Sequence, residues 1–366
     1  MRKLALILLT LLTFTVIPPS HADSSIYIVD KPHQLFDGSF LDDELATSLL
    51  PTGKLGSYVY SPPRSSVNWY VDGALLQTIF EMSDGYTLVD GTDGEGSLAA
   101  KSWLIRFALS TSGDKVFSLA YGNPDLEVAG RLAPSELSAY FEYGRSKVES
   151  LIPGHKVETA PLSVSTGKST LSAPLQKVYT QNRQALTKLS AVVDSQELKT
   201  LRSSLSIVMN PLLAKKDQLL LSQSAMKEVG VFVDKLQVTN GKYQLTSAKV
   251  KVPVTLKNDF DKPVTLFLRL TPSNTRVVVD KKFEVTIPAN SRTQFSVPFT
   301  VIAPGATVVT AQLTNSQGQA IGAPALLSLN LSIFDSRVAW FTSGAGILLL
   351  IAAITQTIRR VRRSRK

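Results

Sequence analysis

Hydrophobic and polar positions follow three different patterns along this chain of 366 residues. Over residues 23–154, short strand-like runs such as IYIVD, NWYVD and KVFSLAY alternate with helix-like runs such as ALLQTIFEMS. Such alternation is typical of βαβ units that build a parallel sheet. A closed (β/α)₈ barrel takes about 250 residues, far more than this region contains. We therefore expect a partial, barrel-like α/β domain.

The pattern becomes helical over residues 171–233. Apolar residues recur there at the three- and four-residue spacing of a helix face, as at Leu186 and Leu189 and again at Leu198 and Leu201. The preceding segment, 155–170, is rich in Ser, Thr and Pro and predicts a linker, with an edge strand as the alternative.

Strict alternation sets in over residues 234–335. In KVKVPVTLKN the apolar residues Val252, Val254 and Leu256 alternate with polar ones, and Asn258 begins a turn before the next alternating run. About seven such strands in roughly 100 residues are typical of an immunoglobulin-like β-sandwich. The Cys and Trp hallmarks of true immunoglobulins are absent. The chain as a whole is thus expected to be an α+β multidomain protein.

The two ends carry targeting patterns. Residues 1–22 hold two positive charges, an apolar run and the small-x-small triplet Ser20-His21-Ala22, which is the pattern of a cleavable signal peptide. Residues 338–358 contain no charge and are long enough for one transmembrane helix. The basic tail, 359–366, follows directly, and its positive charges predict that this end of the chain lies in the cytoplasm. We expect a single-pass protein of the cell membrane with its N-terminal body outside the cytoplasm.

Charge and composition exclude several function classes. Of the net charge of +10, two charges lie at positions 2 and 3 and six in the tail, so only two remain for the body. A nucleic-acid-binding face is therefore not expected. The chain has no cysteine and three histidines, which gives little material for a metal site, and no cofactor motif is present. The expected partners are the lipid bilayer, through the C-terminal helix, and cell-wall polymer or envelope proteins.

Several segments carry a family resemblance. DKPHQLFDGSFLDDELATSLLPTGKL, NWYVDGALLQTIFEMSDGY and SLAYGNPDL near the N-terminus, and VTLKNDFDKPVTLFLRLTP with the RRVRRSRK tail, resemble a family of secreted, membrane-anchored actinobacterial envelope proteins. The chain is similar to a shortened member that lacks much of the second half of the barrel-like domain. The family brings no established activity. Its genes often lie beside that of the lipid II flippase, which implies a role near cell-wall assembly.

Polar side chains follow three of the predicted strands. Asp30 and His33 come after the first, Asp72 after the second, and Asn123 and Asp125 after the third. The carboxyl ends of parallel strands share one edge of a sheet, where ligand-binding and catalytic groups gather.

Two interpretations of these residues stay open. A carbohydrate-active hydrolase, or the remnant of one, would use Asp72 and Asp125 as acid and base, while Asp30, His33 and Asn123 are candidates for ligand binding. The alternative is that the two carboxylates cap the helices that follow them, because Asp is favoured at helix starts. We favour capping, and with it a binding or scaffolding protein rather than an enzyme.

Overall fold

The computed structural model describes residues 24–63, 65–332 and 345–357. The predicted signal peptide, the basic tail and parts of the predicted transmembrane segment lie outside these ranges. The described part of that segment is helical over 345–357. Among the residues that the structure describes, no helix combines the length and the apolar character needed to cross a membrane.

The N-terminal part is a parallel sheet whose strands follow one another in chain order. The strands are β1 (Ser24–Ile28), β2 (Val67–Val71), β3 (Lys115–Ser118) and β4 (Val157–Thr159), and their spatial order is β1-β2-β3-β4. The strands of a parallel barrel follow one another in the same sequential order, and the sheet described here contains four of them. β4 lies inside the segment 155–170, which thus contributes an edge strand to the sheet rather than serving only as a linker.

Six helices connect these four strands, two between each strand and the next. They are α1 (Glu44–Leu49), α2 (Lys54–Tyr60), α3 (Gly73–Ser83), α4 (Ser97–Ser110), α5 (Leu126–Leu132) and α6 (Leu137–Leu151). Alternate strand residues such as Trp69 and Val71 are fully buried in a core with Trp103 and Phe107 of α4. The other sheet face carries a row of stacked rings, Tyr27, Tyr70 and Phe117, with centroids 4.9 and 5.1 Å apart.

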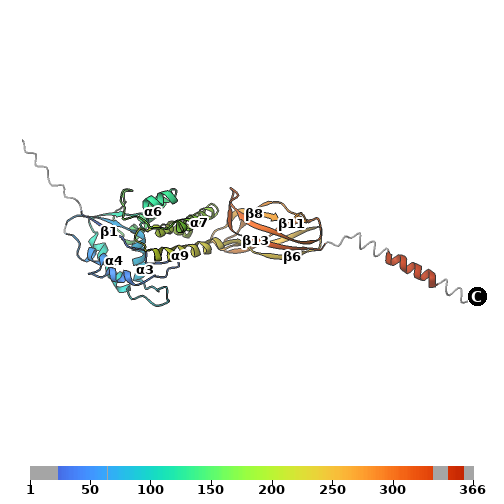
Figure 1. The fold of residues 1–366 in the computed structure, drawn as a ribbon, viewed down its shortest axis with the longest axis horizontal. Coiled ribbons are helices and arrows are strands. Elements are labelled where there is room, and N and C mark those ends of the chain that lie inside the picture. Colours follow the sequence, from blue (N-terminus) through green and yellow to red (C-terminus); the bar gives the residue numbers. More distant parts are fainter. Residues whose placement is uncertain (1–23, 64, 333–344, 358–366) are drawn as a thin grey trace, which may run out of the picture.

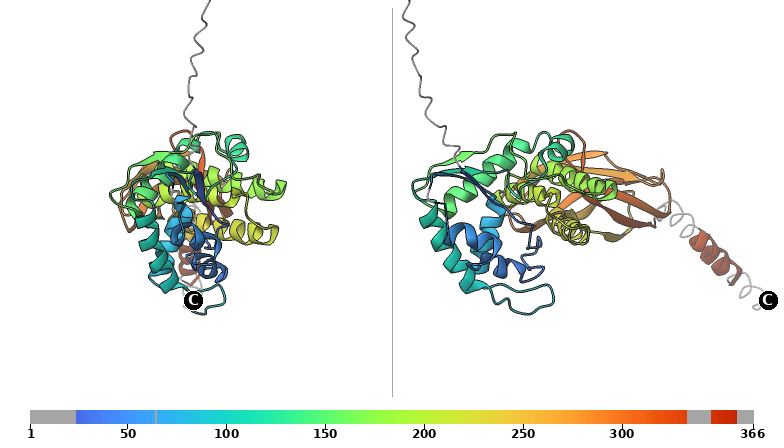
Figure 2. Two further views of the ribbon diagram at one scale, coloured as in Figure 1. Left: turned by 90° about the vertical axis from the view of Figure 1, so that its left-hand side faces the viewer. Right: turned by 60° about the vertical axis from the view of Figure 1, so that its left-hand side comes forward.

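A helical segment follows the sheet. It contains α7 (Ala173–Ser190), α8 (Gln196–Ser204), the 3₁₀ helix η1 (Leu205–Met209) and α9 (Lys215–Asp234). Figure 1 shows α7 and α9 running side by side from the α/β part toward the sandwich. The right-hand view in Figure 2 also shows the α/β part and the sandwich at opposite ends of an elongated molecule, whereas the left-hand view looks along its long axis.

The C-terminal part is a β-sandwich, as the alternating pattern predicted. One sheet has the order β10-β8-β12-β13-β6 and the other β5-β7-β11-β9. The strands are β5 (Leu236–Val238), β6 (Gly241–Leu245), β7 (Lys249–Asn258), β8 (Val264–Pro272), β9 (Val277–Val278), β10 (Lys282–Ile287), β11 (Ser291–Val301), β12 (Gly305–Thr314) and β13 (Ala320–Leu331). Val252, Val254 and Leu256 point into its core, and Asn258 fixes the predicted turn by donating to three backbone oxygens.

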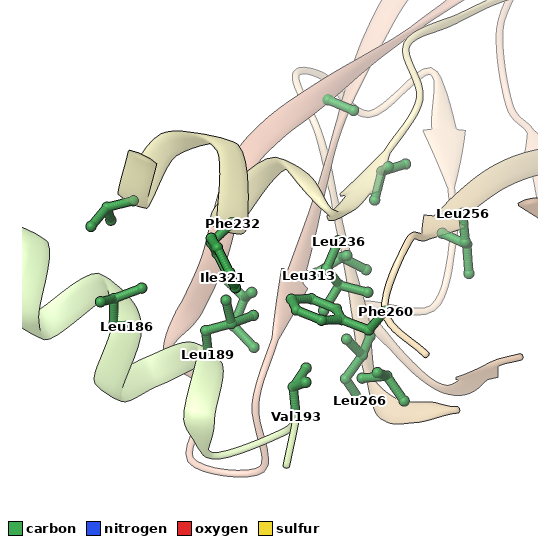
Figure 3. Packing of buried hydrophobic residues seen from close by; sticks show 14 of the residues in the cluster. Leu186, Leu189, Val193, Phe232, Leu236, Leu256, Phe260, Leu266, Leu313 and Ile321 are labelled. Carbon is green, nitrogen blue, oxygen red and sulfur yellow. The ribbon is translucent and has the colours of Figure 1, made fainter. Parts of the chain in front are cut away.

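The helical segment and the sandwich share one hydrophobic core. Leu186 and Leu189 of α7 and Phe232 of α9 lie against Ile321 of β13, and Phe260 continues the cluster into the sandwich (Figure 3). Ile321, Leu189 and Phe260 are nearly inaccessible to solvent. Because the two parts bury apolar surface on each other, the sandwich is joined to the helices by packing as well as by chain connection.

Candidate functional site

Asp72 lies at the carboxyl edge of the sheet and holds two strand ends together. Its Oδ1 accepts hydrogen bonds from the backbone N–H of Ala74, 2.9 Å away in the first turn of α3, and from that of Gly122, 2.8 Å away after β3. The side chain is only 2% exposed. Burial raises the pKa of Asp72 to about 7, although the backbone N–H groups act in the opposite direction. Asp72 is therefore an N-cap and a bridge between β2 and β3.

Asp125 uses both carboxylate oxygens as acceptors. Oδ1 caps α5 by accepting from the N–H groups of Glu127 and Val128, at 3.0 and 3.3 Å. Oδ2 accepts from the N–H of Ser169, 2.8 Å away in the segment after β4. The side chain thus ties together α5 and a loop distant in sequence, in addition to the capping role expected of it.

These contacts predict that two substitutions at Asp125 lower the free energy of unfolding by different amounts. An amide side chain offers one acceptor oxygen, so Asp125→Asn loses the bond to Ser169 or the cap, and we expect a loss of about 1 kcal/mol in unfolding free energy. Asp125→Ala loses both and should cost about 2–3 kcal/mol. Urea unfolding followed by circular dichroism measures both values. Equal stability of the Asn variant and the wild type would contradict a structural role for Oδ2.

Asn123 shapes the turn between these two carboxylates. It adopts a left-handed backbone conformation with φ of 47°, and the preceding Gly122 has φ of 75°. Its Oδ1 accepts from the hydroxyl of Thr166 at 2.8 Å. Asn tolerates this conformation better than most residues, which accounts for its place here.

The helical segment closes over this edge of the sheet. Ser206 of η1 donates to the backbone oxygen of Tyr121. Asn210 donates from Nδ2 to the backbone oxygens of Asp30 and Gly122, at 3.3 and 3.0 Å. The N–H of Asp125 donates to the oxygen of Met209 at 3.0 Å. The polar ends of β1 and β3 are therefore covered by η1 instead of standing open to solvent.

A cavity of about 450 Å³ remains between the sheet edge and the helices. Among the residues predicted from the sequence, Asp30, His33 and Asp72 line it, whereas Asn123 and Asp125 do not. Its walls also come from α3, α8 and α9, so both the α/β part and the helical segment form it. A concave, largely apolar site with a few convergent polar groups is the usual form of a small-molecule site.

In the part of the cavity wall that residues 30–36 form, His33 is the most deeply buried titratable group. It is 2% exposed, its Nδ1 lies 3.3 Å from Oδ1 of Asp42, and its Nε2 lies 3.9 Å from Oδ2 of Asp30. Nε2 has no hydrogen-bond partner within the described ranges. Burial acts to lower the pKa of His33, but the nearby carboxylates of Asp30 and Asp42 outweigh it, and the pKa is raised.

Lys31, beside this histidine, is surrounded by acids. Its Nζ lies 2.7 Å from Glu44, 3.1 Å from Asp42 and 3.9 Å from Asp217. Burial opposes the charged form of Lys31, but the hydrogen bonds that it donates to Glu44 and Asp42 raise its pKa. The hydrogen bond to His33 is the largest of the effects that hold the pKa of Asp42 well below its usual range. This wall is a preformed ionic network.

The cavity lining contains further polar groups that the sequence pattern did not reveal. Glu81 of α3 accepts from the side-chain amides of Gln34 and Gln77, both at 2.7 Å. The hydroxyl of Tyr121 donates to Gln77 at 2.9 Å. Glu228 of α9 also lines the cavity. The sequence predicted helical segments where α3 and α9 lie, but not that the two helices would meet at one edge of the sheet.

Metal binding finds no support in the described part of the chain, where no group of three or more His, Asp or Glu side chains is arranged to hold an ion. The carboxylates of Asp42 and Asp30 lie instead beside the ammonium groups of Lys31 and Lys54, at 3.1 and 3.9 Å respectively. The chemistry that this site offers is charge and hydrogen bonding from fixed side chains.

Comparisons with known proteins give one family and several similar folds. The model of a family described as "Family of unknown function (DUF6049)" matches residues 144–366. No curated protein matches the chain.

Among solved structures, WR4, an MSP family member of C. elegans, is 10% identical, with a TM-score of 0.21, over 26% of this chain and 97% of its own. The CARDB domain of the PF1109 protein from Pyrococcus furiosus, in complex with di-metal ions, is 11% identical, with a TM-score of 0.21, over 26% of this chain and 88% of its own. A PapD-like domain of human CEP192 is 10% identical, with a TM-score of 0.21, over 28% of this chain and 87% of its own. These likenesses concern fold alone.

Proposed function

Because the chain belongs to the DUF6049 family, whose function is unknown, we propose its function from its own site: it is a membrane-tethered, extracytoplasmic binding module. The observation that carries this proposal is the cavity of about 450 Å³ at the carboxyl edge of the sheet. That volume suits one small ligand or a short segment of a polymer. The ligand we propose is a component of the cell wall, in line with the family resemblance found in the sequence.

Binding fits the cavity better than catalysis does. Asp72 and Asp125 both accept hydrogen bonds from helix-starting N–H groups, which fixes them as structural ties. His33 and Lys31 are each held between carboxylates. Side chains fixed in this way give a rigid, preorganised surface, which lowers the entropy lost when a ligand binds.

The sandwich is proposed to be the spacer between this site and the membrane. The chain leaves the α/β part through α9, enters the sandwich at β5 and leaves it after β13, ahead of the apolar segment 338–358. The charge asymmetry of the C-terminal end supports an outside body. Protease added to intact spheroplasts should then remove the body and spare only the last residues, whereas complete protection of the body would contradict the outside location.

The binding proposal is tested with the full chain in detergent micelles and soluble fragments released from purified cell wall. We expect the fragments to raise the melting temperature of the protein, because a ligand that binds only the folded state stabilises it. Thr200→Trp, which places a large ring at the cavity wall on α8, should abolish this shift. Thr187→Trp on the exposed side of α7 is the matched control and should keep it. An equal shift in both variants would contradict binding in the cavity.

One observation favours a hydrolase as a second candidate. Asp72 lines the cavity with a pKa of about 7, and a carboxyl group that stays protonated near neutral pH suits a general acid. This alternative predicts that the protein releases reducing sugars from cell-wall polymer and that Asp72→Asn abolishes the release. A wild-type protein without such release, under conditions where the fragments bind, rejects it.

A further inference from the structure

We infer that the cavity selects an amine-bearing, peptide-like ligand, with a cationic ammonium group, an apolar body and a carbonyl oxygen. This inference rests on the proposed binding function and names the chemical class of its ligand. Three features of the cavity support it: an excess of acidic side chains, an apolar lining, and a buried histidine nitrogen without a partner.

The cationic groups of the cavity are already engaged. Lys31 lies within 4 Å of three carboxylates, and His33 lies between two. A negatively charged ligand would have to compete with these carboxylates, so the network leaves little positive charge to offer.

Acidic side chains remain available on the helical walls. Within the described residues, the side chain of Glu81 is hydrogen-bonded only to neutral amides, those of Gln34 and Gln77, so its charge is not balanced by these contacts. Glu228 makes no ion pair within the described residues. Of the described glutamates that the helices contribute to the cavity wall, only Glu197 forms an ion pair, with Lys235 at 3.0 Å. Half-buried carboxylates without a cation beside them attract an ammonium group, whose hydrogen bonds to them are charge-assisted.

The cavity also has room for an apolar group. Apart from the acids, its lining includes Phe36, Leu75, Leu201, Ile207 and Phe232. Leu75, Leu201 and Phe232 are largely buried already, at 5%, 6% and 9% exposure, whereas Phe36 and Ile207 are half-buried and keep accessible apolar surface. A ligand with a hydrocarbon or aromatic body would bury these side chains further.

His33 supplies the third feature. Its Nε2 is buried and has no hydrogen-bond partner in the described part of the chain, and Oδ2 of Asp30 lies 3.9 Å from it. A buried polar atom without a partner costs free energy, which a ligand oxygen at this position would recover. Amine, apolar body and carbonyl oxygen occur together in amino-acid amides and in peptide N-termini.

Four matched probes separate these features: L-phenylalaninamide, phenethylamine, N-acetyl-L-phenylalaninamide and N-acetyl-L-phenylalanine. The first has all three groups, the second lacks the carbonyl, the third lacks the charge and the fourth is an anion. With the full chain in micelles, calorimetry should show L-phenylalaninamide binding about tenfold more tightly than the neutral amide, with no measurable binding of the anion. Phenethylamine should fall between the first and the third.

Two variants test where the ammonium group of the ligand binds. Glu81→Gln and Glu228→Gln should each weaken the binding of L-phenylalaninamide by about tenfold and leave that of the neutral amide unchanged, because only the charged contact is lost. Glu284→Gln, at an exposed position of the sandwich, is the control and should change neither affinity. Melting curves of all three variants check that each is folded.

Two results would overturn the inference. One is that the protein binds cell-wall fragments but either binds none of the four probes or binds the neutral or anionic probe as tightly as the amine. The cavity would then be a binding site for another class of ligand. The other is failure of the fragments and the probes alike, which rejects the proposed binding function together with the ligand class.

Discussion

Asp72→Asn is expected to stabilise the protein at pH 8 and to remove most of the loss of stability that the wild type shows between pH 4 and pH 8. The carboxyl group of Asp72 is 2% exposed and its pKa in the folded protein is about 7, against 3.8 for an aspartate in the unfolded chain. Folding therefore favours the protonated form.

The direction of the pH effect follows from these two pKa values. Below pH 3.8 both states of the protein are protonated at Asp72 and its contribution is fully present. As the pH rises above 3.8 the unfolded chain ionises at Asp72 while the folded protein stays protonated, so stability falls until the pH passes about 7, where the folded protein ionises as well and the loss is complete. Each pKa unit corresponds to about 1.4 kcal/mol, which gives a total loss of roughly 4 kcal/mol. An asparagine at position 72 stays neutral and keeps an oxygen for the N–H groups of Ala74 and Gly122.

Urea unfolding followed by tryptophan fluorescence measures this effect, because Trp69 and Trp103 are both fully buried in the core of the α/β part. The wild type and Asp72→Asn should agree near pH 4 and diverge as the pH rises. Asp280→Asn, at an exposed position of the sandwich, should follow the wild type throughout. If Asp72→Asn lost stability at pH 8, the carboxylate would be the favoured form and the assignment of its raised pKa would be wrong.

Gly144→Ala is expected to destabilise the α/β part by roughly 3 kcal/mol. A Cβ at position 144 of α6 would lie 2.4 Å from the backbone oxygen of Leu119 and 3.0 Å from the N–H nitrogen of Tyr121. Both contacts are with backbone atoms at the end of β3, which cannot rotate away as a flexible side chain could. The helix or the strand end must shift, and overpacking of this kind costs free energy.

Gly130→Ala of α5 is the matched control. A Cβ there has no heavy atom within 4 Å, so the substitution should stabilise the helix by about 0.5–1 kcal/mol through the lower entropy of the unfolded chain. Both variants are compared by the midpoint of thermal unfolding. A Gly144→Ala protein as stable as the wild type would show that α6 does not approach the sheet edge this closely.

The regular parts of the fold could be predicted because their burial follows short sequence periods. Val252, Val254 and Leu256 alternate with exposed residues in the sequence and are buried in β7. The strands before Asp30 and Asp72 were recognised in the same way, and the parallel sheet followed from their alternation with helices. Local turn chemistry was also visible, as at Asn258 and at the helix starts after Asp72 and Asp125.

The composition of the cavity could not be predicted because it depends on long-range packing. Glu81 and Glu228 lie on helices far apart in the chain, and their convergence requires the helical segment to fold back over the sheet edge. The bond from Ser169 to Asp125 and those from Asn210 to Asp30 and Gly122 have no local signal. Asp42 lies just before α1, and nothing in the local sequence indicates that it also contacts His33.

The central claim, that the cavity at the sheet edge is the binding site, is tested most directly by hydrogen exchange of the full chain with and without soluble cell-wall fragments. The account predicts slower exchange in residues 30–36, 73–81, 196–207 and 228–232, which form the cavity walls, and unchanged exchange in the strands of the sandwich. Protection confined to the sandwich, or no protection when the fragments bind, would contradict it.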